Sequence, residues 1–235
     1  MSLIYINPYS FAGAATDPNF ANVSLLLHGD GTNGSQTILD SSSTPKTVIV
    51  VGNTQISTAQ SAFSGGSSIA FDGSGDYLTL PGGSAFEFGT GDFTIEMWVR
   101  AASLSGFQVL IDGRATGSSS PSQRFTAYTN GSSLVWVLDG TDYGGGTLAT
   151  NTWHFIALSR NSGSVRAFND GTQVGSTATN TSSLGIGASR PIIGGAGDVP
   201  TALNFNGFME EIRFTKGVGR YTGNFTSPTA PFPDS

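Results

Sequence analysis

The sequence predicts an all-β protein built as an antiparallel two-sheet sandwich. Apolar and polar residues alternate along several short segments, which is the period of a strand that buries one face. Glycine-rich turns separate these segments at intervals of about 8–12 residues. No stretch has the period of a crossover helix, so parallel strand pairs are not expected. The 33 glycines among 235 residues agree with many tight turns.

Six segments carry the strand signal most clearly. In chain order they are NVSLLLHGDG (22–31), residues 93–99, SLVWVLDG (133–140), WHFIALSR (153–160), SVRAF (164–168) and FNGFMEEIRFT (205–215). Residues 93–99 alternate, with Phe93, Ile95, Met97 and Val99 expected on the inner face. The Asn-Asp-Gly that follows residue 168 predicts a hairpin, because Asp-Gly tolerates positive φ.

The last of these segments combines apolar side chains with a carboxylate. Alternation is expected to place Phe208, Ile212 and Phe214 on one face, and it places Glu210 on that face with them. A carboxylate on an apolar face is costly unless a cation or hydrogen bonds satisfy it. Glu210 is therefore a candidate for such an interaction.

Composition excludes several classes of function. The net charge is −6 and the ten basic residues are scattered, which argues against a nucleic-acid partner. No run of 18 apolar residues is present, so membrane insertion is not expected. The start of the chain lacks the positive region of a secretory signal, which predicts synthesis in the cytoplasm. The absence of cysteine rules out disulfides and thiolate chemistry. With only two histidines in the chain, a zinc site is not expected.

The chain is expected to form one domain, residues 22–225, between an N-terminal arm (1–21) and a proline-rich C-terminal tail (226–235). The arm carries large apolar side chains that would make an adhesive patch if left bare; they are Leu3, Ile4, Tyr5, Ile6, Tyr9 and Phe11. Two main interpretations remain open. The arm packs back on its own sandwich, or it anchors the chain to another subunit or a partner protein.

Five segments together resemble successive parts of the laminin-G-like, concanavalin A-like lectin/glucanase jelly roll. They are VSLLLHGDGTNGSQTILDSS, which begins at Val23, SIAFDGSGDYLTLPG (68–82), GDFTIEMWVR (91–100), NTWHFIALSRNSGSVRAFNDG (151–171) and FNGFMEEIRFTKGVGRYTGNFTSPTAPFP (205–233). The resemblance covers roughly residues 22–233 and implies two large antiparallel sheets packed face to face. LLLHGDG near the front and RFTKGVGRYTGNFTSPTAPFP near the end resemble a subtype common in virion proteins of tailed phages, where such domains belong to the capsid, tail or fibres.

The resemblance also implies a calcium site. Laminin-G-like domains often hold one structural Ca²⁺ with carboxylates and carbonyls, which are ligands suited to this hard cation. The matching positions here are Asp30, Asp72, Asp76 and Glu210. The family more often has Asp at the last of these positions. Plain hydrogen-bonded carboxylates are the alternative interpretation.

Glu96 and Trp98 are the candidate ligand-binding residues, since both occupy the polar face of segment 93–99. A tryptophan ring can stack on a sugar while a carboxylate orients its hydroxyl groups. The alternatives are that Trp98 covers apolar surface while Glu96 bonds a neighbouring strand, or that the face is a subunit interface.

Catalysis is not predicted. Retaining glycosidases need two carboxylates about 5–5.5 Å apart, and the Glu-x-Asp-x-(x)-Glu strand of the laminarinase-like branch is absent. The function predicted first is a non-enzymatic phage virion protein, a capsid decoration or tail/fibre component. Its partners would be other virion proteins or copies of itself, together with weakly bound host-surface glycans. A dedicated carbohydrate-binding lectin is the alternative, and a glycan hydrolase is third.

Overall fold

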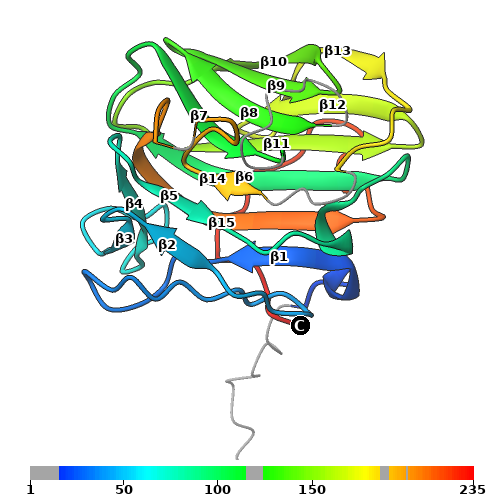
Figure 1. The fold of residues 1–235 in the computed structure, drawn as a ribbon. Helices are drawn as coiled ribbons and strands as arrows, with labels where there is room; N and C mark the ends of the chain where they lie inside the picture. Colours follow the sequence, from blue (N-terminus) through cyan, green and yellow to red (C-terminus); the bar gives the residue numbers. More distant parts are fainter. Residues whose placement is uncertain (1–15, 115–123, 186–190, 200) are drawn as a thin grey trace, which may run out of the picture.

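The computed structural model describes residues 16–114, 124–185, 191–199 and 201–235. In these ranges two antiparallel sheets pack face to face, which confirms the predicted all-β sandwich (Figure 1). Sheet A has eight strands in the order β13 (Thr172–Thr179), β12 (Ser164–Asn169), β11 (His154–Asn161), β6 (Phe93–Ala101), β15 (Asn206–Lys216), β4 (Ser68–Asp72) and β3 (Gln55–Ser57), with β1 (Val23–Leu27) also paired to β15.

Sheet B has seven strands, in the order β10 (Thr141–Thr147), β9 (Ser133–Leu138), β8 (Phe125–Asn130), β7 (Phe107–Asp112), β14 (Ile192–Ile193), β5 (Tyr77–Thr79) and β2 (Ile49–Val51). Two short 3-10 helices, η1 (Phe20–Asn22) and η2 (Ser84–Phe86), complete the described elements. No helix in the described ranges is both long enough and apolar enough to span a membrane.

All six predicted strand segments contain strands, and the hairpin between β12 and β13 turns at Asp170 and Gly171, whose φ angles are 50° and 77°. Two of the strands that were not predicted, β10 and β13, lack clear alternation. β10 reads TDYGGGT and β13 reads TQVGSTAT, so their glycines, threonines and serines hide the two-residue period.

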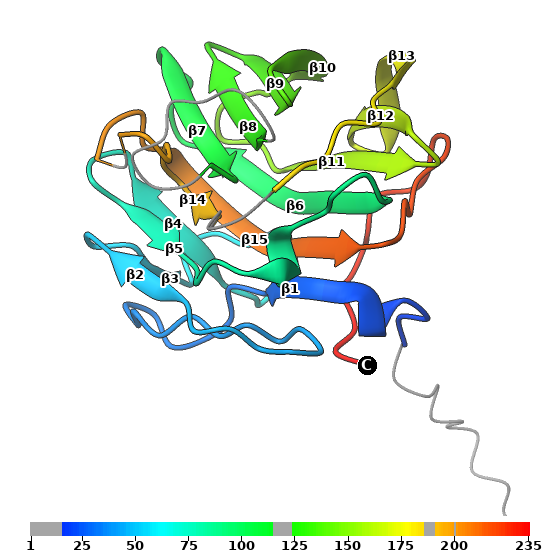
Figure 2. The ribbon, with the colours of Figure 1, turned by 45° about the vertical axis from the view of Figure 1, so that its right-hand side comes forward.

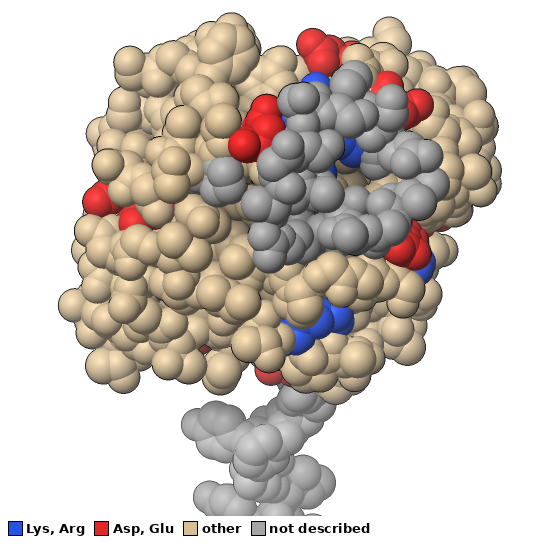
Figure 3. Space-filling model, in the orientation of Figure 1, with Lys and Arg blue, Asp and Glu red and all other residues tan. Residues whose placement is uncertain are grey.

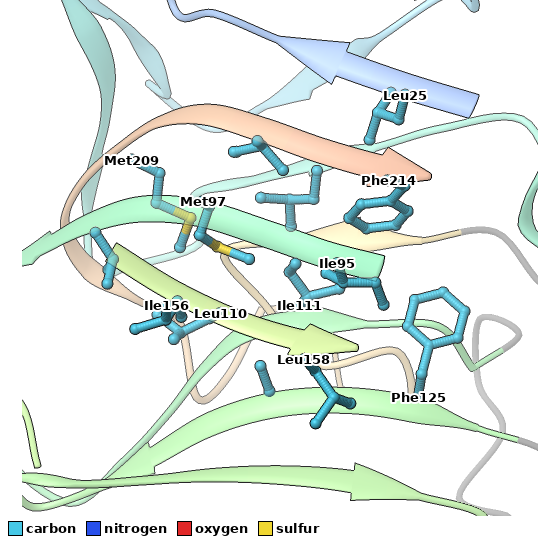
Figure 4. Packing of buried hydrophobic residues seen from close by; sticks show 14 of the residues in the cluster. Leu25, Ile95, Met97, Leu110, Ile111, Phe125, Ile156, Leu158, Met209 and Phe214 are labelled. Carbon is cyan, nitrogen blue, oxygen red and sulfur yellow. The ribbon is translucent and has the colours of Figure 1, made fainter. Parts of the chain in front are cut away.

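The main core lies between the two sheets (Figure 4). The four residues predicted to face inward from β6 are all fully buried. Figure 4 shows side chains of β6 and β11 from sheet A meeting Leu110, Ile111 and Phe125 from sheet B. Each large apolar side chain buried in this way contributes about 1.5–3 kcal/mol to folding.

A β-bulge in β15 corrects one prediction. The pairing of β15 with β6 shifts register between Glu210 and Arg213, and Glu211 has a φ of 53°. Met209 and Ile212 therefore both point into the main core, whereas Phe208 does not belong to it. The bulge adds one residue to the strand and so reverses the alternation, which simple pattern counting cannot foresee.

The outer face of sheet A, the face turned away from sheet B, is also covered. A second apolar cluster on this face contains Val23, Leu26, Phe155, Ala157, Phe168 and Phe232, with Phe20, Trp98, Tyr221 and Phe225 packed against it. Residues 217–235, called the C-terminal segment below, supply three of these aromatic rings. Figure 2 shows this segment in red, crossing the strands of sheet A towards β1.

Candidate functional site

Glu96, one of the two predicted ligand-binding residues, lies beneath the C-terminal segment in a buried ionic network. One Glu96 carboxylate oxygen accepts a hydrogen bond from Arg213 Nε at 2.8 Å, and the other accepts one from the Tyr221 hydroxyl at 2.5 Å. Asp17 accepts hydrogen bonds from Arg213 at 3.1 Å and from Arg220 at 2.6 Å. Glu96 has no exposed surface. The network therefore joins the start of the described chain, two strands and the C-terminal segment.

The protonation states of this network follow from its burial. Burial, reinforced by the charge of Glu96, raises the pKa of Tyr221, so the phenol stays protonated and donates to Glu96. Burial alone would raise the pKa of Asp17. The pKa is nevertheless lowered, because Asp17 accepts hydrogen bonds from Arg220 and the Asn19 backbone and lies near the charges of Arg220 and Arg213. Two carboxylates thus face two guanidinium groups, and the charges balance without solvent.

Trp98, the second predicted residue, is half-buried on the same outer face. Its ring packs edge-on against Phe63, with centroids 6.0 Å apart, and is tilted against Phe155 at 5.4 Å. Trp98 therefore covers apolar surface, and Glu96 bonds neighbouring elements. A sugar could reach Glu96 only if the C-terminal segment moved away, so their role in ligand binding stays a prediction that this closed arrangement does not favour.

The four residues implied for calcium do not form a common site. Asp30 and Asp72 are exposed, whereas Asp76 is buried and accepts hydrogen bonds from the backbone N–H groups of Asn53 and Asp72. An oxygen that faces an N–H donor is poorly placed for a cation. Within the described ranges, no group of three or more His, Cys, Asp or Glu side chains is arranged to hold a metal ion. The residues present therefore do not fit the Ca²⁺ that the family resemblance implies.

Glu210 is a hydrogen-bonded carboxylate, as the alternative interpretation of the calcium positions predicts. It pairs across the sheet with Trp98 and so faces outward, where it accepts hydrogen bonds from the Ala62 N–H at 2.5 Å and the Ser61 hydroxyl at 2.9 Å. Burial raises its pKa to about 7, and the nearby charges of Glu211 and Asp30 act in the same direction. The predicted inward orientation of Glu210 is wrong, because the bulge at Glu211 changes the parity of the strand.

His28 fastens the end of the C-terminal segment, a role that sequence reasoning missed. Its Nδ1 lies 2.8 Å from a Glu211 oxygen and its Nε2 lies 2.7 Å from an Asp234 oxygen. The other Glu211 oxygen accepts the backbone N–H of Phe232 at 2.8 Å. Burial alone would lower the pKa of His28, but the hydrogen bonds and charges of Glu211 and Asp234 outweigh it and raise the pKa to about 9.

This linkage predicts a pH dependence of stability. The pKa of His28 in the folded protein is above its unfolded value of 6.5. Its contribution to the free energy of unfolding is therefore fully present below about pH 6.5 and is lost as the pH rises through about 9. We expect His28→Gln to lower the free energy of unfolding by about 2 kcal/mol at pH 6, a value reduced from the full shift because solvent screens the exposed Asp234. The loss should shrink towards zero by pH 10. Urea unfolding of both proteins across this range measures it, and a loss that does not change with pH would contradict the assignment.

The six apolar arm residues Leu3, Ile4, Tyr5, Ile6, Tyr9 and Phe11 lie outside the described residues. The structure does show how the chain enters the sandwich after them. The Asp17 N–H donates to the backbone oxygen of Ser235 at 2.7 Å, and the Asp17 side chain binds Arg213 and Arg220. Residues from Asp17 onwards are therefore integral to the fold, although the predicted arm extended to residue 21.

An open hollow lies at one end of the sandwich, at the edge where β15 begins. It has a volume of about 310 Å³. We call it the rim cup, and its lining residues are Gly73, Ser103, Ser105, Phe107, Gln108, Leu203, Asn204 and Asn206. All of these are uncharged. Sequence reasoning did not find it, because its residues come from three segments that lie far apart in the sequence.

A second hollow, of about 510 Å³, lies at the opposite end of β15. Both lysines of the chain, Lys46 and Lys216, line it. Their ammonium groups already donate to protein oxygens, since Lys46 bonds the Ser42 hydroxyl and the Thr44 carbonyl and Lys216 bonds the Ser84 carbonyl. This hollow therefore offers less unused chemistry than the rim cup.

Two antiparallel sheets of eight and seven strands, stacked face to face, place the protein in the class of lectin-like jelly rolls. The family model of the laminin-G type, described as concanavalin A-like lectin/glucanases superfamily, matches residues 72–218. The chain therefore belongs to this family. No curated protein matches the chain closely enough to count as a relative.

Solved structures share the fold at low sequence identity. The binding domain of Paraclostridial Mosquitocidal Protein 1 is 15% identical, with a TM-score of 0.64 over 85% of this chain and 50% of that one. The binding domain of Botulinum neurotoxin DC, solved in complex with rat synaptotagmin II, is 17% identical, with a TM-score of 0.58 over 85% of this chain and 49% of that one. The chain thus spans about half the length of these structures. At such identities the likeness establishes the fold alone.

Proposed function

We propose that this chain is a non-enzymatic virion protein of a tailed phage, a capsid decoration or a tail/fibre component. The N-terminal arm anchors it to the particle, and the lectin-like jelly roll displays a surface that weakly binds host glycans. The phage assignment rests on the resemblance of the LLLHGDG and RFTKGVGRYTGNFTSPTAPFP segments. A glycan-binding role is in keeping with a similar solved structure from botulinum neurotoxin type C, whose cell entry depends upon interaction with two ganglioside molecules. It is 14% identical, with a TM-score of 0.58 over 85% of this chain and 49% of that one.

The observation that carries this proposal is the separation between the point where the arm joins and the rim cup. Val23, close to the arm, pairs with Thr215 near the end of β15, whereas Asn206 at the start of β15 lines the rim cup. At about 3.4 Å per residue, these ends lie on the order of 30 Å apart. A chain held through its arm would therefore direct the rim cup away from the particle.

The carboxylates support a role without catalysis. Three of the four glutamates, Glu96, Glu210 and Glu211, are buried and accept hydrogen bonds from protein donors. A glycosidase needs two carboxyl groups that reach the same sugar. These three are instead used to fasten loops and the C-terminal segment to sheet A.

Weak binding is sufficient for a displayed protein. When many copies are held on one particle, a second contact forms at the high effective concentration set by the first. Millimolar contacts with single sugars can therefore give useful avidity. A dedicated lectin would instead bind its glycan selectively without a particle.

The anchoring role predicts different results for two deletions. Removing residues 1–15 should abolish attachment to purified phage particles and leave the melting temperature within about 2 °C of the full chain. Removing residues 1–20 should also lower the melting temperature by about 5 °C or more, because it deletes Asp17 and leaves Arg213 and Arg220 with fewer buried partners. Co-sedimentation with particles and thermal unfolding measure the two effects.

Two results would contradict this proposal. Full attachment by the chain without residues 1–15 would rule out the arm as anchor. Release of reducing ends from polysaccharides by the full chain would show that the protein is an enzyme.

A further inference from the structure

The loops around the rim cup are held in fixed positions by one buried glutamine. Gln108 accepts a hydrogen bond from the Asn206 N–H at 2.9 Å. Its amide nitrogen donates to the carbonyls of Ser103 and Ser105, at 3.0 and 3.3 Å. The turn before β7 and the start of β15 are thereby locked together, so the cup is formed before any ligand arrives.

Leu203 adopts a backbone conformation that leucine rarely takes. Its φ is 58°, in the left-handed region that glycine favours, and its side chain is 45% exposed. The Val109 N–H donates to the Leu203 carbonyl at 2.8 Å, which holds the residue there. Glycine would adopt this conformation without strain, and the exposed side chain adds little to the core. Retained strain of this kind points to a use for the side chain.

Phe107 adds an aromatic ring to the lining of the same cup. It is 50% exposed, one of only a few large apolar residues in the described chain that are this accessible. Its ring lies 5.5 Å from that of Tyr128 at an angle of 42°, which steadies its outer position. A half-exposed aromatic ring fixed next to amide and hydroxyl groups can stack on the C–H face of a sugar.

The absence of charge in the cup narrows the class of ligand. Its polar contacts are amide, hydroxyl and backbone groups, and no acidic or basic side chain lines it. Elsewhere on the molecule, Figure 3 shows acidic and basic groups standing out from a largely uncharged visible surface. We propose that the rim cup is a binding site for a neutral sugar, with Phe107 and Leu203 contacting its apolar face and Asn206 its hydroxyl groups. This assignment rests on the proposed glycan-binding function and names its site.

The test uses the full chain, tetramerised through a biotin tag, on an array of neutral and sialylated oligosaccharides. The wild type is expected to bind neutral glycans in preference to sialylated ones. Phe107→Ala should weaken binding by about fivefold to tenfold, in keeping with the loss of one aromatic contact. Leu203→Gly should also weaken binding, yet it should raise the melting temperature by about 2–4 °C because it relieves the backbone strain.

Two matched controls separate a specific site from general surface effects. Leu39→Ala removes a leucine that is 70% exposed, and Ile49→Ala removes an isoleucine that is 51% exposed, both outside the cup. Neither should change binding.

The outcomes distinguish this assignment from the proposed function. If the wild type binds glycans and both cup variants bind equally well, the site lies elsewhere and the rim-cup assignment is overturned while the proposed function stands. If the wild type binds no glycan, the glycan-binding part of the proposed function fails as well. If the cup variants instead lose self-association in sedimentation experiments, the cup is a contact between copies, which also overturns the assignment.

Discussion

A chain that ends at Gly219 is expected to lose its soluble folded state. The truncation uncovers apolar side chains on the outer face of sheet A, among them Leu26, Phe155 and Phe168. It also removes Arg220 and Tyr221 from the buried carboxylates of Asp17 and Glu96. Exposed apolar patches of this kind promote association, and buried charges that lose their partners destabilise the fold. The soluble fraction on expression and the binding of a hydrophobic dye report the result.

A synthetic peptide of residues 220–235 provides the control for this truncation. If the C-terminal segment acts by covering sheet A, the peptide should restore part of the soluble, folded protein when it is added during refolding. A truncated chain that stays soluble and melts at the same temperature as the full chain would show that the segment is dispensable.

Arg213→Met is expected to lower the free energy of unfolding by about 3–5 kcal/mol, the usual effect of removing one partner from a buried ion pair. The guanidinium group bonds both Glu96 and Asp17, and it lies 3.5 Å from the centre of the Phe232 ring. Methionine keeps much of the side-chain volume but leaves the two carboxylates facing Arg220 alone. Urea unfolding at neutral pH measures the change.

The double variant Glu96→Gln with Arg213→Met tests whether the loss comes from an unpaired charge. It should recover part of the stability, because Arg220 then faces one buried carboxylate, Asp17, and Glu96 has become a neutral amide. Arg166→Met serves as control, since the described residues show no ion pair for Arg166, and a loss below about 0.5 kcal/mol is expected for such a surface change. An equal loss for Arg166→Met and Arg213→Met would contradict the account.

The sequence allowed the sandwich to be predicted, because β6 and β11 carry a clear two-residue period and their inward residues are buried as expected. It did not reveal what covers the other side of those strands. Alternation places Glu96 and Trp98 on the outer face of β6, and this pattern is the same whether that face meets water or a further layer of the chain. The hydrogen-bond partners of Glu96 are Arg213 and Tyr221, which are 117 and 125 positions away, and only the fold brings them together.

Local backbone irregularities account for the other differences. The bulge at Glu211 reverses the faces of β15, so Glu210 and Phe208 turn outward, and no residue type in that strand marks it. The rim cup is equally hidden, because the left-handed Leu203 is separated by almost a hundred positions from Phe107. By contrast, the structure gives the RFTKGVGRYTGNFTSPTAPFP segment a physical role in the fold. Its Arg213, Arg220, Tyr221 and Phe232 close the outer face of sheet A.

Hydrogen–deuterium exchange of the peptides that cover residues 220–233 tests most directly whether the C-terminal segment closes this face. The amides of Arg220, Tyr221, Phe225 and Phe232 all donate hydrogen bonds to sheet A or the turns joining its strands, so these peptides should be protected for minutes to hours, as sheet A is. Complete exchange within seconds at neutral pH would mean that the segment is detached and that Glu96 and Trp98 are open to ligands.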